Sequence, residues 1–233
     1  MNKAVLITGV SGGIGKAVAM KFAQNGWNIV ATYNKNKISN EVAEFCQQKG
    51  VDLVQMQLDI TSSVDVEKVF AEAFKGQNIE CVICNSGISL GEKMLCDVSD
   101  EEIDQLVQTN LIGTIYCNRQ ASKLLLSKRR GDIINVSSIY GVNGGSCEAV
   151  YSATKAGINA LSLSLAKELE CAGVNVNAVA PGFVETNMTA CFSKEEIQQI
   201  RESGEMNVLK PEDVANAVFA MVGTGLSGQV IVL

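Results

Sequence analysis

The feature that most constrains the fold of this 233-residue chain is a regular alternation of short apolar segments with longer helical patterns. The short segments are almost continuously apolar, as at 5–7 (VLI) and 133–136 (IINV), which is typical of parallel strands buried on both faces. Alternating strands and helices predict crossover connections and a sheet covered by helices on both sides. We therefore expect an α/β fold: a single doubly wound domain over 1–233 with a mostly parallel, seven-stranded sheet.

Apolar periodicity gives approximate boundaries for these elements. Strands are expected near 3–8, 28–33, 52–58, 79–84, 132–137, 174–179 and 228–233. Helices are expected near 14–25, 38–49, 63–75, 101–128, 151–171 and 211–222. The least regular region is 182–210, which contains a short helical pattern from Ser193 to Glu202. Such segments often cover binding sites, so this one is either a mobile substrate cover or an ordinary surface excursion.

Charge and composition narrow the choice of partners. The formal net charge is −6, which leaves no basic excess for nucleic acid or an anionic membrane surface. No apolar stretch reaches the roughly 18 residues that a spanning helix needs, and the apolar run at the N-terminus is too short for a signal peptide. We expect a soluble, cytoplasmic protein whose eight cysteines are reduced thiols.

The chain contains no histidine, which excludes a Ser-His-Asp triad, an imidazole base and a histidine metal ligand. Cys81 and Cys84 form a C-x-x-C motif, but they lie within an apolar strand pattern, where side chains three apart point to opposite faces. We expect two packed thiols there, and we predict no metal site.

A glycine-rich turn at 8–16 (TGVSGGIGK) joins the first expected strand to the first expected helix. Glycines at positions 9, 13 and 15 permit a tight turn and let backbone amides approach a pyrophosphate. The anion would then lie at a helix N-terminus, which carries about half a positive charge. This turn, in the first strand–turn–helix unit of an α/β chain, predicts a dinucleotide site.

The end of the second strand indicates which dinucleotide is bound. NAD enzymes place a carboxylate there for the ribose 2′-hydroxyl, but residues 31–37 read ATYNKNK. No acid is present to repel a 2′-phosphate, and Lys35 and Lys37 could pair with it, which favours NADPH over NADH. The alternative is that both lysines are solvated loop charges, since the glycine-rich turn has no arginine to clamp the phosphate.

The T-G-x-x-x-G-x-G spacing at 8–15 resembles the short-chain dehydrogenase/reductase family, and the resemblance extends along nearly the whole chain. Further matching segments are 58–61 (LDIT), 84–87 (CNSG), 134–138 (INVSS), 151–157 (YSATKAG) and 177–186 (NAVAPGFVET), although Cys84 and Ser86 depart from the family pattern. The resemblance implies a Rossmann fold, with Asp59 accepting from the adenine amino group. The implied cofactor contacts are Gly9, Ser11, Gly13, Ile14, Gly15, Asn34, Lys35, Asp59, Ile60, Asn85, Gly87, Tyr151, Lys155, Pro181, Gly182, Val184 and Thr186.

The resemblance also implies a catalytic set, which comprises Asn110, Ser138, Tyr151 and Lys155. Tyr151 and Lys155 are four apart at the start of a helical pattern, so they share a face. Ser138 follows a buried strand, at the sheet edge where ligands bind in such folds. In the implied mechanism the nicotinamide gives a hydride to a ketone carbon, Ser138 polarises the carbonyl and Tyr151 protonates the oxygen. Lys155 would bind the ribose and lower the Tyr151 pKa, and Asn110 would position a water.

Within the family the closest resemblance is to bacterial 3-oxoacyl-acyl-carrier-protein reductases, at 180–189 (APGFVETNMT) and 210–218 (KPEDVANAV). This resemblance implies an NADPH-dependent reductase of fatty acid synthesis. The carrier protein is acidic, so the basic run 128–130 is one candidate docking point for it. The alternative is that this run is only a solvated helix end.

Two alternatives remain open. The string SCE at 146–148 resembles strings in reductases that act on the aminopentanone modification of elongation factor P. A Glu148 side chain that faces the pocket would suit such a cationic substrate. The alternative is that Cys147 and Glu148 only shape the loop. A non-catalytic NADP-binding sensor is the other.

The family forms homotetramers or homodimers through helices corresponding to 101–128 and 151–171. This chain lacks the D-G-G tail that the family usually carries after the last strand, so the second, C-terminal interface is in doubt and a homodimer is a stronger alternative than usual.

Overall fold

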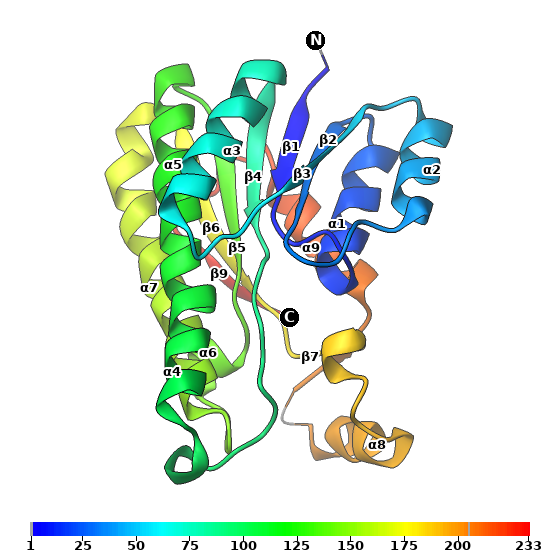
Figure 1. The fold of residues 1–233 in the computed structure, drawn as a ribbon, viewed down its shortest axis with the longest axis vertical. Helices are drawn as coiled ribbons and strands as arrows, with labels where there is room; N and C mark the ends of the chain where they lie inside the picture. Colours follow the sequence, from blue (N-terminus) through cyan, green and yellow to red (C-terminus); the bar gives the residue numbers. More distant parts are fainter. Residues whose placement is uncertain (1, 205) are drawn as a thin grey trace.

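A computed structural model describes residues 2–204 and 206–233. Its centre is a seven-stranded, all-parallel sheet in the order β3-β2-β1-β4-β5-β6-β9 (Figure 1). The strands are β1 (Ala4–Ile7), β2 (Asn28–Tyr33), β3 (Leu53–Gln57), β4 (Ile79–Cys84), β5 (Gly131–Val136), β6 (Val174–Ala180) and β9 (Val230–Val232). The predicted α/β class, parallel sheet and strand positions are confirmed.

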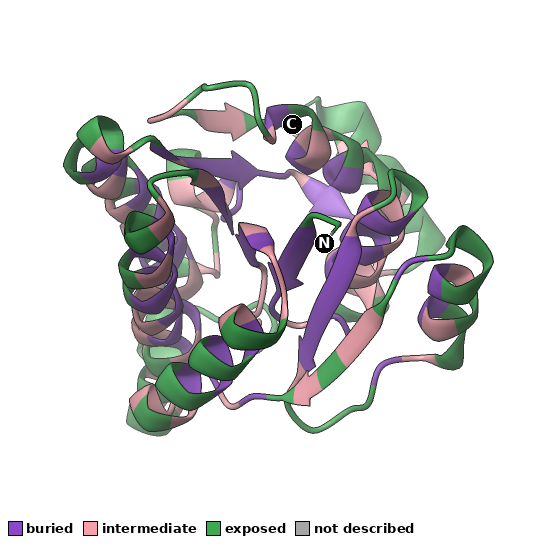
Figure 2. Ribbon diagram, turned by 90° about the horizontal axis from the view of Figure 1, so that it is seen from above, coloured by how far each residue is buried: buried purple, intermediate pink, exposed green. Residues whose placement is uncertain are grey.

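Helices cover both faces of this sheet. One layer consists of α1 (Gly13–Gln24), α2 (Asn40–Lys49) and α9 (Pro211–Met221). The other consists of α3 (Ser63–Gly76), α4 (Asp100–Leu106), α5 (Thr114–Lys128) and α7 (Ala149–Leu169). Seen from above, the strands are mostly buried while the outer faces of the helices are exposed (Figure 2). Two apolar clusters, one under each layer, form the core.

The C-x-x-C motif lies in β4 as expected. Cys81 is fully buried in the cluster under α1 and α9, and Cys84 is buried in the cluster on the opposite face. The strand alternation therefore separates the two thiols, and the prediction that they are packing residues is confirmed.

The predicted helix at 101–128 is wrong in one respect, because the structure divides it into three parts. Between α4 and α5 the chain forms η2, a π-helix over Val107–Gly113. At its end a Cβ added to Gly113 would lie 2.9 Å from Ile60 Cδ1, so the glycine lets this segment approach the loop after β3 closely. A π-helical turn keeps the apolar pattern nearly helical, which is why periodicity does not detect it, and such turns are frequent at functional sites.

The region 182–210 contains more regular secondary structure than the sequence indicates. β7 (Phe183–Val184) and β8 (Val208–Leu209) pair in a separate two-stranded ribbon, and α8 (Lys194–Ser203) lies between them in sequence. A capping box between Ser193 and Glu196 begins α8 close to its predicted start. Residue 205, within this region, lies outside the described residues.

Four short turns complete the connections: η1 (Leu95–Asp97), α6 (Tyr140–Asn143), η3 (Glu170–Ala172) and η4 (Asn187–Thr189). Across residues 2–204 and 206–233, none of the helices combines the length and apolar character needed to cross a bilayer.

Candidate active site

Three of the predicted catalytic residues meet where β5 ends and α7 begins. Lys155 Nζ lies 5.5 Å from the ring centroid of Tyr151, one helical turn away, and donates a hydrogen bond of 3.0 Å to the carbonyl of Val136. Ser138, just past β5, is hydrogen-bonded to the Tyr151 side chain. The structure thus brings Ser138, Tyr151 and Lys155 together at the carboxyl edge of the sheet.

Burial dominates the ionisation of this cluster. Removal from water raises the pKa of Tyr151 to about 12, against the opposing effect of its hydrogen bond with Ser138. The same cause lowers the pKa of Lys155, whose side chain is buried, to about 8. Lys155 is not among the groups that shift the Tyr151 pKa here, since its ammonium is directed at the Val136 carbonyl. The expectation that Lys155 and the cofactor together lower this pKa concerns the complex and stays a prediction.

Asn110 joins this cluster through the loop after β4. It is fully buried in η2, where Oδ1 accepts from the Ile88 amide and Nδ2 donates to the Ile88 carbonyl, both at 2.8 Å. A Cβ added to Gly87 would lie 3.2 Å from Asn110 Oδ1 and 3.6 Å from Lys155 Nζ. Gly87 therefore lies next to both side chains, and the carboxamide of Asn110 fixes the loop that carries it.

The glycine-rich turn forms an open helix N-terminus. Gly9 has a φ of +75°, and a Cβ on Gly15 would lie 2.2 Å from the Gly9 carbonyl oxygen, so both positions require glycine. The residue preceding α1, Gly12, has no capping side chain, and the first turn of α1 has no acidic residue. The first amides of α1 are therefore available to an anion.

Asn85, directly after β4, supports this turn. Its Nδ2 donates to the carbonyls of Thr8 and Gly9, both at 3.0 Å, and its backbone amide donates to Thr8 Oγ1 at 3.0 Å. The side chain is thus engaged with the turn, and we interpret Asn85 as a residue that shapes the cofactor site.

The loop after β3 presents a carboxylate. Asp59 Oδ1 accepts from the amide and hydroxyl of Thr61 at 3.0 and 2.7 Å, whereas Oδ2 has no hydrogen-bond partner among the described residues. The side chains of Ile14, Ile60 and Val184 pack into the core, so these three predicted contacts can reach a cofactor only through their backbone.

The loop after β2 adjoins the glycine-rich turn, because Ser11 Oγ donates to the Asn36 carbonyl at 2.7 Å. Gln57 Nε2 donates to the carbonyl of Asn34 at 3.0 Å, which fixes the start of this loop. Lys35 and Lys37 are exposed and have no ion-pair partner within residues 2–204 and 206–233.

The segment after β6 closes over the same turn. The Pro181 carbonyl accepts from the Ile139 amide at 2.8 Å, and a Cβ on Gly182 would lie 2.6 Å from the Asn207 carbonyl oxygen. A Cβ on Gly13 would lie 3.2 Å from Thr186 Cγ2, so Thr186 lies directly against the glycine-rich turn. The predicted residues 181–186 thus reach the rest of the predicted cofactor site.

A small hollow beside Tyr151 includes residues that the sequence did not indicate. Its lining comes from the loop after β4, from α4 and from the start of α7: Leu90, Gly91, Lys93, Val98, Glu102, Leu106, Cys147, Glu148, Ala149, Val150 and Tyr151. Ser89 Oγ donates to Glu148 Oε1 at 3.4 Å, and burial raises the pKa of Glu148. The loop residues were missed because neither spacing nor periodicity relates them to Tyr151.

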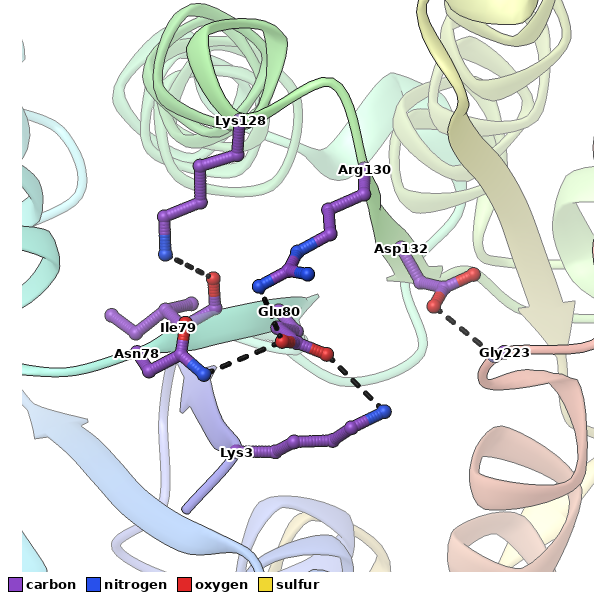
Figure 3. A network of polar contacts seen from close by, with 8 residues as sticks. All are labelled: Lys3, Asn78, Ile79, Glu80, Lys128, Arg130, Asp132 and Gly223. Carbon is purple, nitrogen blue, oxygen red and sulfur yellow. Dashed lines mark hydrogen bonds and ion pairs between the residues drawn. The ribbon is translucent and has the colours of Figure 1, made fainter. Parts of the chain in front are cut away.

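The basic run at 128–130 lies at the opposite edge of the sheet, where β5 begins (Figure 3). Lys128 donates to the Ile79 carbonyl at 2.9 Å, and Arg130 pairs with Glu80 at 3.0 Å. The length of β5, about 20 Å for a strand of this size, separates the run from Ser138. The prediction that this run docks a carrier protein therefore needs an acyl carrier that reaches about 20 Å to Ser138, and it stays a prediction.

Comparison with known proteins gives a consistent match. A family model described as short chain dehydrogenase matches residues 3–197. The 3-oxoacyl-[acyl-carrier-protein] reductase FabG of Staphylococcus aureus (strain Mu50) is 35% identical over 221 residues, which cover 94% of this chain and 89% of that protein. The reductase of the same name from Aquifex aeolicus (strain VF5) is 34% identical, covering 99% of this chain and 95% of that one. An uncharacterized oxidoreductase, YmfI of Bacillus subtilis (strain 168), is also 34% identical, covering 99% and 97%.

Two solved structures have the same fold over the whole chain. A tyrosine-to-phenylalanine variant of ElxO with NADPH bound has a TM-score of 0.90 and 26% identity, covering 100% of this chain and 97% of that one. The crystal structure of gox2181 has a TM-score of 0.92 at 23% identity, covering 100% and 94%, and it supports the fold alone.

Proposed function

Because the chain belongs to the short-chain dehydrogenase family, and is therefore an oxidoreductase, we propose that it is an NADPH-dependent reductase that transfers hydride to a ketone. The observation that carries this proposal is the cluster of Ser138, Tyr151 and Lys155 at the carboxyl edge of the sheet. This cluster lies at the same end of the sheet as an uncapped helix N-terminus, which suits a dinucleotide pyrophosphate.

The residues present fit NADPH, which supplies the hydride when bound. The amides at the start of α1 would hold the pyrophosphate, and Asp59 Oδ2 would accept from the adenine amino group. Lys35 and Lys37, with no carboxylate paired to them in the described structure, would bind the 2′-phosphate. The NADPH bound to the ElxO variant supports this choice.

In the reaction the side chains act on the carbonyl oxygen. Ser138 donates a hydrogen bond to that oxygen, and Tyr151 gives its phenolic proton to it while the carbon accepts the hydride. A Tyr151 pKa near 12 keeps the phenol protonated throughout the neutral range. The phenol is thus in the protonated form that reduction of the carbonyl requires.

Lys155 and Asn110 prepare this proton transfer. The Lys155 ammonium would bind the ribose hydroxyls and stabilise the negative charge that develops on Tyr151. Asn110 holds the loop at Gly87 and Ile88 next to Lys155, where a water that resupplies the proton would be positioned.

For the substrate we propose a 3-oxoacyl thioester carried by acyl-carrier protein, as in fatty acid synthesis. The names of the relatives that are 34–35% identical to this chain support this choice. The hollow beside Tyr151 has a volume of about 20 Å³, too small to hold an acyl chain as it stands, but Leu90, Val98, Leu106 and Val150 give the approach to Tyr151 apolar walls.

One observation favours a second substrate, a ketone that carries an amine, such as the aminopentanone modification on elongation factor P. Glu148 lies in the same hollow, and its one hydrogen-bond partner in the described structure is the neutral hydroxyl of Ser89. A half-buried carboxylate without a cation is stabilised by an ammonium on the substrate.

The distinguishing experiment measures NADPH consumption with an acetoacetyl thioester and with an amino ketone of matched length, in the wild type and in Glu148→Gln. The first proposal predicts turnover of the thioester that Glu148→Gln leaves nearly unchanged. The second predicts a preference for the amino ketone that Glu148→Gln reduces about tenfold or more. Bound NADPH without turnover of either ketone would instead favour the sensor.

Location and assembly are part of the same proposal. We place the enzyme in the cytoplasm because all eight cysteines are free thiols, four of them buried. We propose that it forms a homodimer or homotetramer through α5 and α7, each of which exposes a leucine, Leu126 and Leu163.

A further inference from the structure

A second hollow lies at the amino edge of the sheet, at the opposite end of the strands from Tyr151. Its volume is about 340 Å³, within the range of roughly 300–1,000 Å³ that small-molecule sites occupy. It opens between the starts of β1, β4 and β5 and the loop after α9, and its walls include Lys3, Glu80, Arg130 and Asp132.

One wall of this hollow has an excess of positive charge. Glu80 pairs with Lys3 at 3.2 Å and with Arg130 at 3.0 Å, so two cations share one carboxylate (Figure 3). The side chains of Lys3 and Arg130 are 60% and 63% exposed, whereas that of Glu80 is 14% exposed. Both cations can therefore reach a ligand while the carboxylate holds them in place.

A second wall of the hollow carries a buried carboxylate. Asp132 is 6% exposed and accepts hydrogen bonds from Asn175 Nδ2 and from the Gly223 amide, both at 3.1 Å. Both donors are neutral, and Asp132 forms no ion pair with any residue in the described parts of the chain. The charge of Lys3, which is paired with Glu80, acts on Asp132 only from a distance. A buried carboxylate of this kind is stabilised by a cationic partner, which the protein itself does not bring into contact.

We propose that this hollow binds a small zwitterion of the amino-acid class, with its ammonium group against Asp132 and its carboxylate against Arg130 and Lys3. A simple anion would gain the two cations but would meet the Asp132 carboxylate, and a simple amine would gain Asp132 but would meet both cations. A ligand that carries both charges satisfies both walls at once.

Binding in this hollow can be followed by tryptophan fluorescence, because Trp27 lines it and is the only tryptophan in the sequence. The Lys3 ammonium lies 5.5 Å from the Trp27 ring centroid, so a ligand that draws Lys3 away changes the surroundings of the indole. Tryptophan fluorescence therefore measures binding here without any use of the reductase reaction, and the result is independent of the proposed function.

The test is a fluorescence titration of the full-length protein with glycine, β-alanine and γ-aminobutyrate, and with acetate and ethylammonium as single-charge controls. We expect a saturable change with at least one zwitterion, with a dissociation constant in roughly the millimolar range, and none with either control. Arg130→Gln should weaken binding about tenfold or more. Arg129→Gln removes the same charge from the neighbouring position, which does not line the hollow, and should leave binding unchanged.

Asp132→Asn tests the other wall and should also weaken binding about tenfold or more. The exposed Arg130→Gln variant keeps the proposal testable should Asp132→Asn fold poorly. The absence of any saturable change with the zwitterions would overturn it, as would equal binding of acetate or an equal loss in Arg129→Gln.

Discussion

Tyr151 and Lys155 are both shifted toward their neutral forms by burial. The pKa of Tyr151 rises to about 12 and that of Lys155 falls to about 8, although the two side chains are in contact distance on one helix face. A charged lysine at this position is a cost to the folded protein, because the unfolded chain solvates the same ammonium freely. Keeping Lys155 charged next to the reacting oxygen therefore lowers the free energy of unfolding.

Replacement of Lys155 should make that cost measurable. Its pKa falls from 10.5 to about 8, so the unfolded state binds more protons between these values and stability rises with pH across that window. Below pH 8 the full cost remains, on the order of 3 kcal/mol. We expect Lys155→Met to raise the free energy of unfolding at pH 7 by about 1–3 kcal/mol in denaturant titrations, while reductase activity is lost. A less stable variant would contradict this account.

The same titration should appear in the pH profile of the wild type. The value of kcat/KM reports the ionisations of the free enzyme, so ketone reduction should decline as pH rises through about 8, where Lys155 loses its proton. Lys155→Arg, whose side chain stays charged, serves as the comparison because its residual activity should not decline in this range. A wild-type profile that is flat to well above pH 8 would exclude a required ammonium.

At the scale of elements, the sequence predicted regular structure well and the contacts between irregular segments poorly. The seven strands were found because buried parallel strands are continuously apolar, and Tyr151 and Lys155 were paired because one helical turn separates them. The pairing of Asn110 with Ile88 and of Glu148 with Ser89 depends on the path of the loop after β4. No local pattern encodes that path, because these partners meet only when the sheet has formed.

The π-helical segment η2 gives the next prediction. A methyl group at Gly113 would lie 2.9 Å from Ile60 Cδ1, so Gly113→Ala should displace η2 and with it Asn110. We expect a destabilisation of about 1–3 kcal/mol, as for overpacking in a core, together with reduced activity. Gly76→Ala is the matched control, because nothing lies within 4 Å of its added methyl group. Equal stability of the two variants in thermal unfolding would show that η2 tolerates the displacement.

At the scale of the whole molecule, one sheet connects two sites of different character. Both apolar clusters use side chains of the same strands, which is why we propose that 1–233 acts as one domain. The carboxyl edge carries the catalytic cluster and the glycine-rich turn, whereas the amino edge carries the hollow lined by Trp27 and Asp132. The helices α5 and α7 remain available on the outside of one layer for association with a second copy.

Association through these helices is testable with one surface substitution. Leu163 on α7 is 40% exposed, and Leu163→Lys places a charge in the proposed interface, which should lower the molar mass measured by light scattering. Val64→Lys on α3, where the valine is 75% exposed, is the control and should leave the mass unchanged. A monomeric wild type, or an unchanged mass in Leu163→Lys, would refute an interface at this position.

The central claim, that Tyr151 delivers the proton in an NADPH-dependent ketone reduction, is tested most directly by Tyr151→Phe. The measurement is single-turnover oxidation of bound NADPH with a panel of 3-oxoacyl thioesters and amino ketones, alongside NADPH binding, with Tyr116→Phe on α5 as the control. We predict that Tyr151→Phe binds NADPH normally and reduces the best substrate about 10²–10⁴-fold more slowly, while Tyr116→Phe, whose ring lies against Arg119, stays close to wild type. Undiminished reduction by Tyr151→Phe, or a wild type that binds NADPH and reduces no ketone of the panel, would contradict the account.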